Sequence, residues 1–267
     1  PNYRSMLHFT VKNISICPRL PRVEKANGPR SGFRLRGRLL SFIVLLLSLM
    51  QSVAWGQTVL IDPAGAGGFE LGNTLTLNGW TAVNGTQPNY WMVGTATKYA
   101  GNNCAYITNN ASANQYSNGS TSTVHFYRDI SVPSGERLIT LSFYFKGTGE
   151  AGWDRLLVFT APTSVTPVAG TPASNSTTMT GAQLIYMQDV TISNYTQVTT
   201  ILSPSFAGNT FRLIFTWQND DNTGTNPPAS VDDVRVSSQA ADAFTTTGTS
   251  SVTIPSNAIS VTGYLWG

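Results

Sequence analysis

Charge is scarce in this 267-residue sequence, where Asp, Glu, Lys and Arg together make up only 11%. Nine of the 16 basic residues but only one of the 13 acidic residues lie within positions 1–38. Positions 57–267 therefore hold seven basic and twelve acidic side chains, a net charge of −5. A mildly acidic body of this kind argues against a basic groove for phosphates, so we expect no nucleic-acid partner.

Cysteine and histidine are almost as scarce, with two residues of each. Cys17 lies in the N-terminal part, which leaves Cys104 without a disulfide partner in the body and excludes a thiolate metal cluster. His125 has neither a G-x-S-x-G nor an H-E-x-x-H motif around it. Nothing in the sequence sets two carboxylates across a glycosidase cleft. We therefore expect no catalysis in these residues.

Long hydrophobic runs are also missing. The apolar run Leu39–Met50 is well short of the roughly 20 residues that a membrane span needs. It follows the basic stretch 34–38, and Ala54 and Gly56 then supply small residues at the −3 and −1 positions of a cut before Gln57. This pattern predicts a leader over 1–56 with a cleavable signal peptide, and hence a secreted or cell-surface protein with no membrane span in the mature chain. A transmembrane anchor is the alternative.

Helix-forming runs of Ala, Leu, Glu and Lys are absent as well, whereas Thr, Ser, Asn and Gly are abundant. Short runs of alternating apolar residues recur between turn clusters, at 124–132, 138–146, 156–160, 195–202 and 210–217. This spacing predicts an all-β fold, a two-sheet antiparallel β-sandwich of the jelly-roll type over 57–238. We expect a linker at 239–243 and, over 244–267, the start of a truncated second β domain with a hairpin about Pro255. Because the sequence opens on Pro1, we expect it to be a fragment.

The stretch Ser230–Ser237 is a strand pattern with an acid at a core position. Alternation places Asp232 on the same face as Val234 and Val236, and Asp233 on the other face. A buried carboxylate is costly unless it is paired, hydrogen-bonded or bound to a metal. Asp232 therefore needs a partner, which is a cation, a set of backbone N–H groups or an Arg.

Two blocks of sequence bracket the predicted sandwich: 67–72 (GGFELG) with 78–80 (NGW) at its start, and 231–234 (VDDV) at its end. They resemble galactose-binding-like and carbohydrate-binding-module jelly rolls. Further segments resemble the MAM-like, cleaved-adhesin or choice-of-anchor J domains of Bacteroidetes surface proteins. Those segments are 91–96, 105–110, 125–130 and 227–234, and the resemblance spans about 62–238. The segment 252–267 resembles the opening of glycine-rich surface repeats.

This resemblance implies structural calcium. Glu70 and Asp232 match the positions that ligate it in the related jelly rolls, with Asp233 or Asp62 as further donors. Alternatively, Asp232 is satisfied by hydrogen bonds and Glu70 is simply solvated. The loop 218–226 also gathers oxygen ligands that could hold a second cation. We favour a solvated turn instead, because Asn, Asp and Gly are preferred in turns for backbone reasons alone.

Exposed aromatic side chains are the candidates for ligand binding, because sugars stack on their faces. Trp153 lies in the polar loop 149–155, and Tyr90 and Trp91 follow the loop 84–89. The alternative is that these rings cover the ends of a sheet. Trp80 and Trp217 are at core positions and are expected to pack in the interior.

The resemblance implies a non-catalytic extracellular adhesion or binding module whose partners are glycans or surface proteins. An alternative is an accessory substrate-binding domain of a secreted hydrolase, either a peptidase or a glycosidase, whose catalytic domain lies outside this sequence. A third is a spacer without a ligand.

Overall fold

A computed structural model describes residues 7–11, 57–172, 179–189, 191–240 and 261–265. The chain divides into two units, one of residues 54–242 and one that combines 1–53 with 243–267. Within the latter, β1 (Leu7–Val11) pairs antiparallel with β13 (Val261–Leu265). The predicted signal peptide and the hairpin turn at Pro255 lie outside the described residues. No helix in the described part of the chain is long and apolar enough to cross a membrane.

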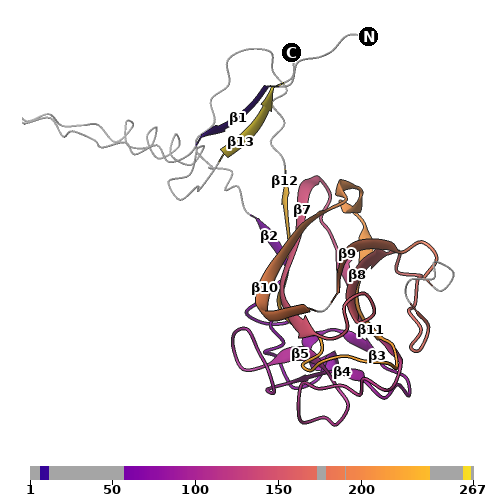
Figure 1. The fold of residues 1–267 in the computed structure, drawn as a ribbon. Helices are drawn as coiled ribbons and strands as arrows, with labels where there is room; N and C mark the ends of the chain where they lie inside the picture. Colours follow the sequence, from indigo (N-terminus) through magenta and orange to yellow (C-terminus); the bar gives the residue numbers. More distant parts are fainter. Residues whose placement is uncertain (1–6, 12–56, 173–178, 190, 241–260, 266–267) are drawn as a thin grey trace, which may run out of the picture. The chain divides into compact units, whose positions relative to one another are not determined.

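The larger unit is a β-sandwich of two antiparallel sheets, as the sequence predicts (Figure 1). The β12 sheet has the order β10-β7-β12-β5-β4, with β2 also paired to β12, and the β11 sheet has the order β3-β6-β11-β8-β9. The strands of the β12 sheet are β2 (Thr58–Ile61), β4 (Tyr90–Gly94), β5 (Cys104–Thr108), β7 (Glu136–Thr148), β10 (Thr191–Leu202) and β12 (Ser230–Ala240). Those of the β11 sheet are β3 (Thr81–Val83), β6 (Ser122–Ser131), β8 (Arg155–Ala161), β9 (Gln183–Asp189) and β11 (Thr210–Asn219). Two short 3₁₀ helices, η1 (Thr76–Asn78) and η2 (Pro204–Phe206), complete the elements.

Aromatic rings fill the space between the two sheets. Phe126 of β6 stacks on Phe215 of β11 with centroids 4.8 Å apart, and Trp91 meets Phe126 edge to face at 4.9 Å. Phe143 of β7 contacts Phe215 from the opposite sheet at 5.2 Å. Aromatic pairs of this kind stabilise a core beyond the area that they bury. Trp80 and Trp217 are buried with them, as the sequence predicts.

The two ends of the sandwich meet on β12. This strand pairs with β7 along one edge, while along the other it pairs with β5 at Ser230 and Val231 and then with β2 at Val236 to Ser238. Between the residues that pair with β5 and those that pair with β2, the register of β12 against β7 shifts at Asp232 to Arg235. Asp233, within this shift, adopts a positive φ of 48°. A Cβ on Gly67 would lie 1.8 Å from the carbonyl oxygen of Val234, so only glycine allows the N-terminal segment to approach β12 so closely.

The described residues 162–172 and 179–182, which we call the cover segment, lie on the outer face of the β11 sheet. Its residues Val165, Met179 and Ala182 pack against Leu157, Phe159 and Ile214 of the sheet. Arg212 donates from Nη1 to the carbonyl oxygen of Val165 at 2.7 Å. The outer face of this sheet is therefore a second, smaller apolar layer.

Candidate functional site

Asp232 lies at the point where β12 changes partner, and its residue is fully buried. Its Oδ2 accepts hydrogen bonds from the backbone N–H groups of Tyr99 at 2.8 Å and Ala100 at 3.2 Å, and its Oδ1 accepts one from Asp233 N at 2.8 Å. Burial raises the pKa of Asp232 to about 6 against these three opposing hydrogen bonds. The carboxylate thus connects β12 to the loop 98–103, at a place where β12 pairs with neither β5 nor β2.

Glu70 and Asp233 are the other two acids of this region. Glu70 accepts backbone hydrogen bonds from Asn102 and Asn103 at 2.8 and 2.9 Å. Desolvation raises the pKa of Glu70, but these hydrogen bonds outweigh it and leave the pKa below its usual value. For Asp233, desolvation and then the negative charge of Glu70 raise the pKa. The two carboxylates are therefore close enough to repel each other.

The surroundings of Gly68 and Asp62 bear on the predicted calcium. A Cβ on Gly68 would lie 2.2 Å from the carbonyl oxygen of Pro63 and 3.1 Å from Asp233 Oδ1, so Gly68 packs tightly between these two atoms. Asp62 is exposed and accepts from Ala64 N at 3.0 Å. No three acidic, His or Cys side chains among the described residues form a metal cage. Calcium binding by Glu70, Asp232, Asp233 or Asp62 stays a prediction.

The structure separates the three aromatic candidates. Trp153 is 59% exposed, and Tyr90 is half-buried. Trp91 is only 2% exposed, and its indole N–H donates to the carbonyl oxygen of Val124 at 3.2 Å. The expectation that Trp91 is accessible is therefore wrong: alternation along β4 turns this ring into the core and leaves Tyr90 outside. A binding role for Trp153 and Tyr90 stays a prediction.

His125 lies under the cover segment and is 1% exposed. Its Nδ1 lies 2.8 Å from Thr216 Oγ1, and its Nε2 lies 3.3 Å from the carbonyl oxygen of Val168. Burial lowers the pKa of His125 to about 4, so the imidazole is neutral at pH 7. The side chain joins the sheet to its cover.

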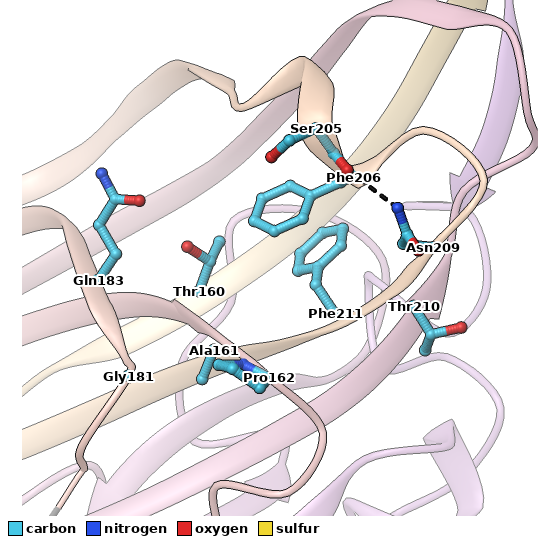
Figure 2. Close-up of a pocket in the computed structure, with 10 residues that line it drawn as sticks. All are labelled: Thr160, Ala161, Pro162, Gly181, Gln183, Ser205, Phe206, Asn209, Thr210 and Phe211. Atoms are coloured by element: carbon cyan, nitrogen blue, oxygen red, sulfur yellow. Dashed lines mark hydrogen bonds between the residues drawn. The ribbon is translucent and has the colours of Figure 1, made fainter.

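A pocket of about 370 Å³ opens where η2, the end of β8 and the start of β9 meet. Phe206 stacks on Phe211 with centroids 4.3 Å apart and forms one wall, and Gln183 and Thr160 stand opposite, as Figure 2 shows. The ten residues that line the pocket are Thr160, Ala161, Pro162, Gly181, Gln183, Ser205, Phe206, Asn209, Thr210 and Phe211. None of them carries a charge.

Local hydrogen bonds fix the turn that carries Phe206. Ser203 caps η2 by accepting from Ser205 N at 3.3 Å, with Pro204 at the first helical position. Asn209 Nδ2 donates to the carbonyl oxygens of Ser205 at 3.0 Å and Ala207 at 3.3 Å. This use of the amide nitrogen leaves Asn209 Oδ1 as an acceptor at the pocket. Phe206 is half-buried, whereas Phe211 is 1% exposed and belongs to the core.

Sequence reasoning did not find this pocket. Its walls come from three segments that are distant in sequence, 160–162, 181–183 and 205–211. One signal was present: Phe206 is an aromatic residue inside the turn 203–209, between two predicted strands, where alternation gives it no core position.

Comparisons with known proteins find likeness in structure alone. No family model and no curated protein match the chain. The CBM22-1 xylan-binding domain of Paenibacillus barcinonensis Xyn10C is 14% identical, with a TM-score of 0.42 over 71% of this chain and 99% of that chain. TmCBM61, solved with β-1,4-galactotriose, is 8% identical, with a TM-score of 0.41 over 66% and 97%. The family 11 carbohydrate-binding module from Clostridium thermocellum, solved with a β-1,3-1,4-mixed-linked tetrasaccharide, is 14% identical, with a TM-score of 0.38 over 68% and 96%. At this level of likeness no ligand and no residue role transfers to this chain.

Proposed function

We propose that the sandwich is a non-catalytic module that binds an uncharged glycan in the Phe206 pocket. The observation that carries this proposal is the combination of one half-buried aromatic wall with hydroxyl and amide side chains opposite it. A sugar ring presents apolar C–H surface to an aromatic ring and hydroxyl groups to polar side chains. The pocket volume of about 370 Å³ falls in the lower part of the range of about 300–1,000 Å³ that is usual for ligand pockets.

The charge of the pocket narrows the class of ligand. Because every lining residue is uncharged, a phosphate or carboxylate group would lose its water without gaining an ion pair. A neutral sugar pays a smaller dehydration cost, because the side chains of Gln183, Asn209 and Thr160 offer both donors and acceptors that replace its hydrogen bonds to water. Neutral hexose or pentose units are therefore the ligands that this chemistry fits.

The expected result on a glycan array is binding of the wild-type chain to a set of neutral glycans and loss of that set in Phe206→Ala. We expect an affinity at least about tenfold lower, since truncation removes the stacking surface and about 1.4 kcal/mol of binding free energy. Ile201→Ala is the matched control, because Ile201 is 70% exposed and lies outside the pocket. A Trp153→Ala variant tests the exposed aromatic ring instead.

Two results would contradict the proposal. Wild type that binds no glycan leaves the pocket without a ligand of this class. Binding that survives Phe206→Ala but is lost in Trp153→Ala moves the site to the loop 149–155. Melting temperatures of the variants confirm that each remains folded.

The wider role that we propose is adhesion, with the module exported by a signal peptide whose apolar part is 39–50 and attached to glycans or surface proteins. The run of apolar residues after basic ones supports export. An accessory domain of a secreted hydrolase would use the same pocket. The full reading frame separates the two, since surface repeats favour the adhesin and an enzyme motif favours the hydrolase.

Structural calcium at Glu70 and Asp233 is the second part of the proposal. Removal of metal with EDTA should lower the melting temperature by about 5 to 10 °C, because a ligand at 100 times its Kd stabilises by about 2.7 kcal/mol. The shift should shrink in Glu70→Gln, which keeps the shape of the side chain and removes its charge. An unchanged melting temperature and no metal on elemental analysis would remove calcium from the account.

A further inference from the structure

Two acidic side chains, Asp154 and Glu150, have buried oxygen atoms near the loop 220–226, although Glu150 as a whole is only half-buried. Asp154 is fully buried, and its Oδ2 accepts hydrogen bonds from the Tyr116 hydroxyl at 2.5 Å and from Glu150 N at 2.8 Å. A Cβ on Gly224 would lie 1.9 Å from the Tyr116 hydroxyl oxygen and 2.9 Å from Asp154 Oδ2. The loop therefore closes directly over this carboxylate.

One oxygen of each acid is left without a partner. Asp154 Oδ1 and Glu150 Oε2 are both buried, and neither makes a hydrogen bond with the described residues. The two ion pairs in the described part of the chain, Arg155–Asp189 and Arg212–Asp129, include neither of them. Asp220, in the loop above, contributes a further negative charge that Asp154 senses. Buried charge without compensation is costly, so this arrangement calls for a positive partner.

We propose that a divalent cation, best suited by Ca²⁺, binds between Asp154 Oδ1 and Glu150 Oε2 and joins the loop 149–154 to the loop 220–225. The available ligands are all oxygens, which excludes metals that prefer nitrogen or sulfur. The described His and Cys of the sandwich lie elsewhere, with His125 under the cover segment and Cys104 beside Tyr195. Ca²⁺ accepts six to eight oxygens in irregular geometry, so carbonyls and water complete a site with few carboxylates.

The cation would also fix the exposed Trp153. This residue lies between the two acids in sequence, and its N–H donates to the carbonyl oxygen of Glu150 at 3.2 Å. With both ends of the turn held by one ion, the ring is presented in a constant position at 59% exposure. The site is independent of the glycan proposal, because no residue of the Phe206 pocket takes part in it.

Terbium luminescence of the metal-stripped protein tests the site. Tb³⁺ is a substitute for Ca²⁺, and the Tyr116 hydroxyl, 2.5 Å from Asp154, places a sensitising ring beside the ion. We expect sensitised emission that Ca²⁺ displaces, and at least a tenfold weaker Tb³⁺ affinity in Glu150→Gln. Glu70→Gln is the matched control and should retain this emission. Glu150 is chosen because its side chain, unlike that of Asp154, makes no described hydrogen bond to the fold.

Hydrogen exchange provides a second measurement. Ca²⁺ should slow exchange at the amides of 149–154 and 220–225 in wild type and not in Glu150→Gln. A proton shared by the two carboxyl groups is the competing account of the unpartnered oxygens. Two results together would support the shared proton and overturn the cation. Wild type and Glu150→Gln would give the same Tb³⁺ emission, and Ca²⁺ would leave hydrogen exchange in both loops unchanged.

Discussion

Replacing Asp232 by Ala should destabilise the protein by about 3 to 4 kcal/mol in urea unfolding. The substitution removes the acceptor of three backbone N–H groups, those of Tyr99, Ala100 and Asp233, at a site from which water is excluded. An unsatisfied buried donor costs about 1 to 3 kcal/mol. Relief of the buried charge offsets part of this loss, because the raised pKa of Asp232 shows that burial of the carboxylate is itself unfavourable.

Asp232→Asn separates the two contributions. The amide oxygen accepts from at most two of the three N–H groups, and the amide nitrogen must face the third. We expect a loss of about 1 to 2 kcal/mol, intermediate between wild type and Ala. If Asp232→Ala unfolds at the same urea concentration as wild type, then the hydrogen bonds at this edge do not hold β12 to the loop 98–103.

The protein should lose about 3 kcal/mol of stability through His125 alone as the pH falls from 7 to 4. The folded pKa is about 4, below the value of about 6.5 for an unfolded chain, so the unfolded state binds the proton first between these values. Stability contributed by the neutral imidazole is therefore complete above pH 6.5 and decreases down to pH 4. Protonation also turns Nδ1 into a donor, which then competes with the Thr216 hydroxyl.

His125→Gln is the variant that isolates this effect, because other titrating groups contribute to both proteins. Asp232, with its raised pKa, acts in the opposite direction and cancels in the difference. The free energy of unfolding of wild type minus that of His125→Gln should decrease by about 3 kcal/mol between pH 7 and pH 4. A difference that stays constant over this range would mean that the ring is hydrated in the folded protein.

The fold class was predictable because it depends on patterns that are local in sequence. Alternation in 210–217 places Phe211, Leu213 and Phe215 on one face, and these residues are buried in the core. β2 pairs with β12, so the first and last strands of the sandwich are neighbours. The burial of Asp232 was also predicted from alternation, and its hydrogen bonds to the loop 98–103 are one of the two partners considered.

The binding pocket was not predictable in the same way, since it depends on contacts between distant segments. Phe206 gains its partner Phe211 only when η2 turns back on β11. Alternation also failed to predict that Ile214 and Thr216 are buried, because the cover segment encloses a face that an isolated sheet would expose. Trp91 was misplaced because its strand begins directly after the polar loop 84–89 that suggested exposure.

Mapping of amide chemical shifts during titration with a neutral glycan identified on the array tests the central claim most directly. We expect the largest changes at residues 160–162, 181–183 and 205–211, which surround the pocket, and none of comparable size in Phe206→Ala. Changes confined to the loop 149–155 or to the strand that carries Tyr90 would show that the ligand binds elsewhere and would contradict the proposed function of the pocket.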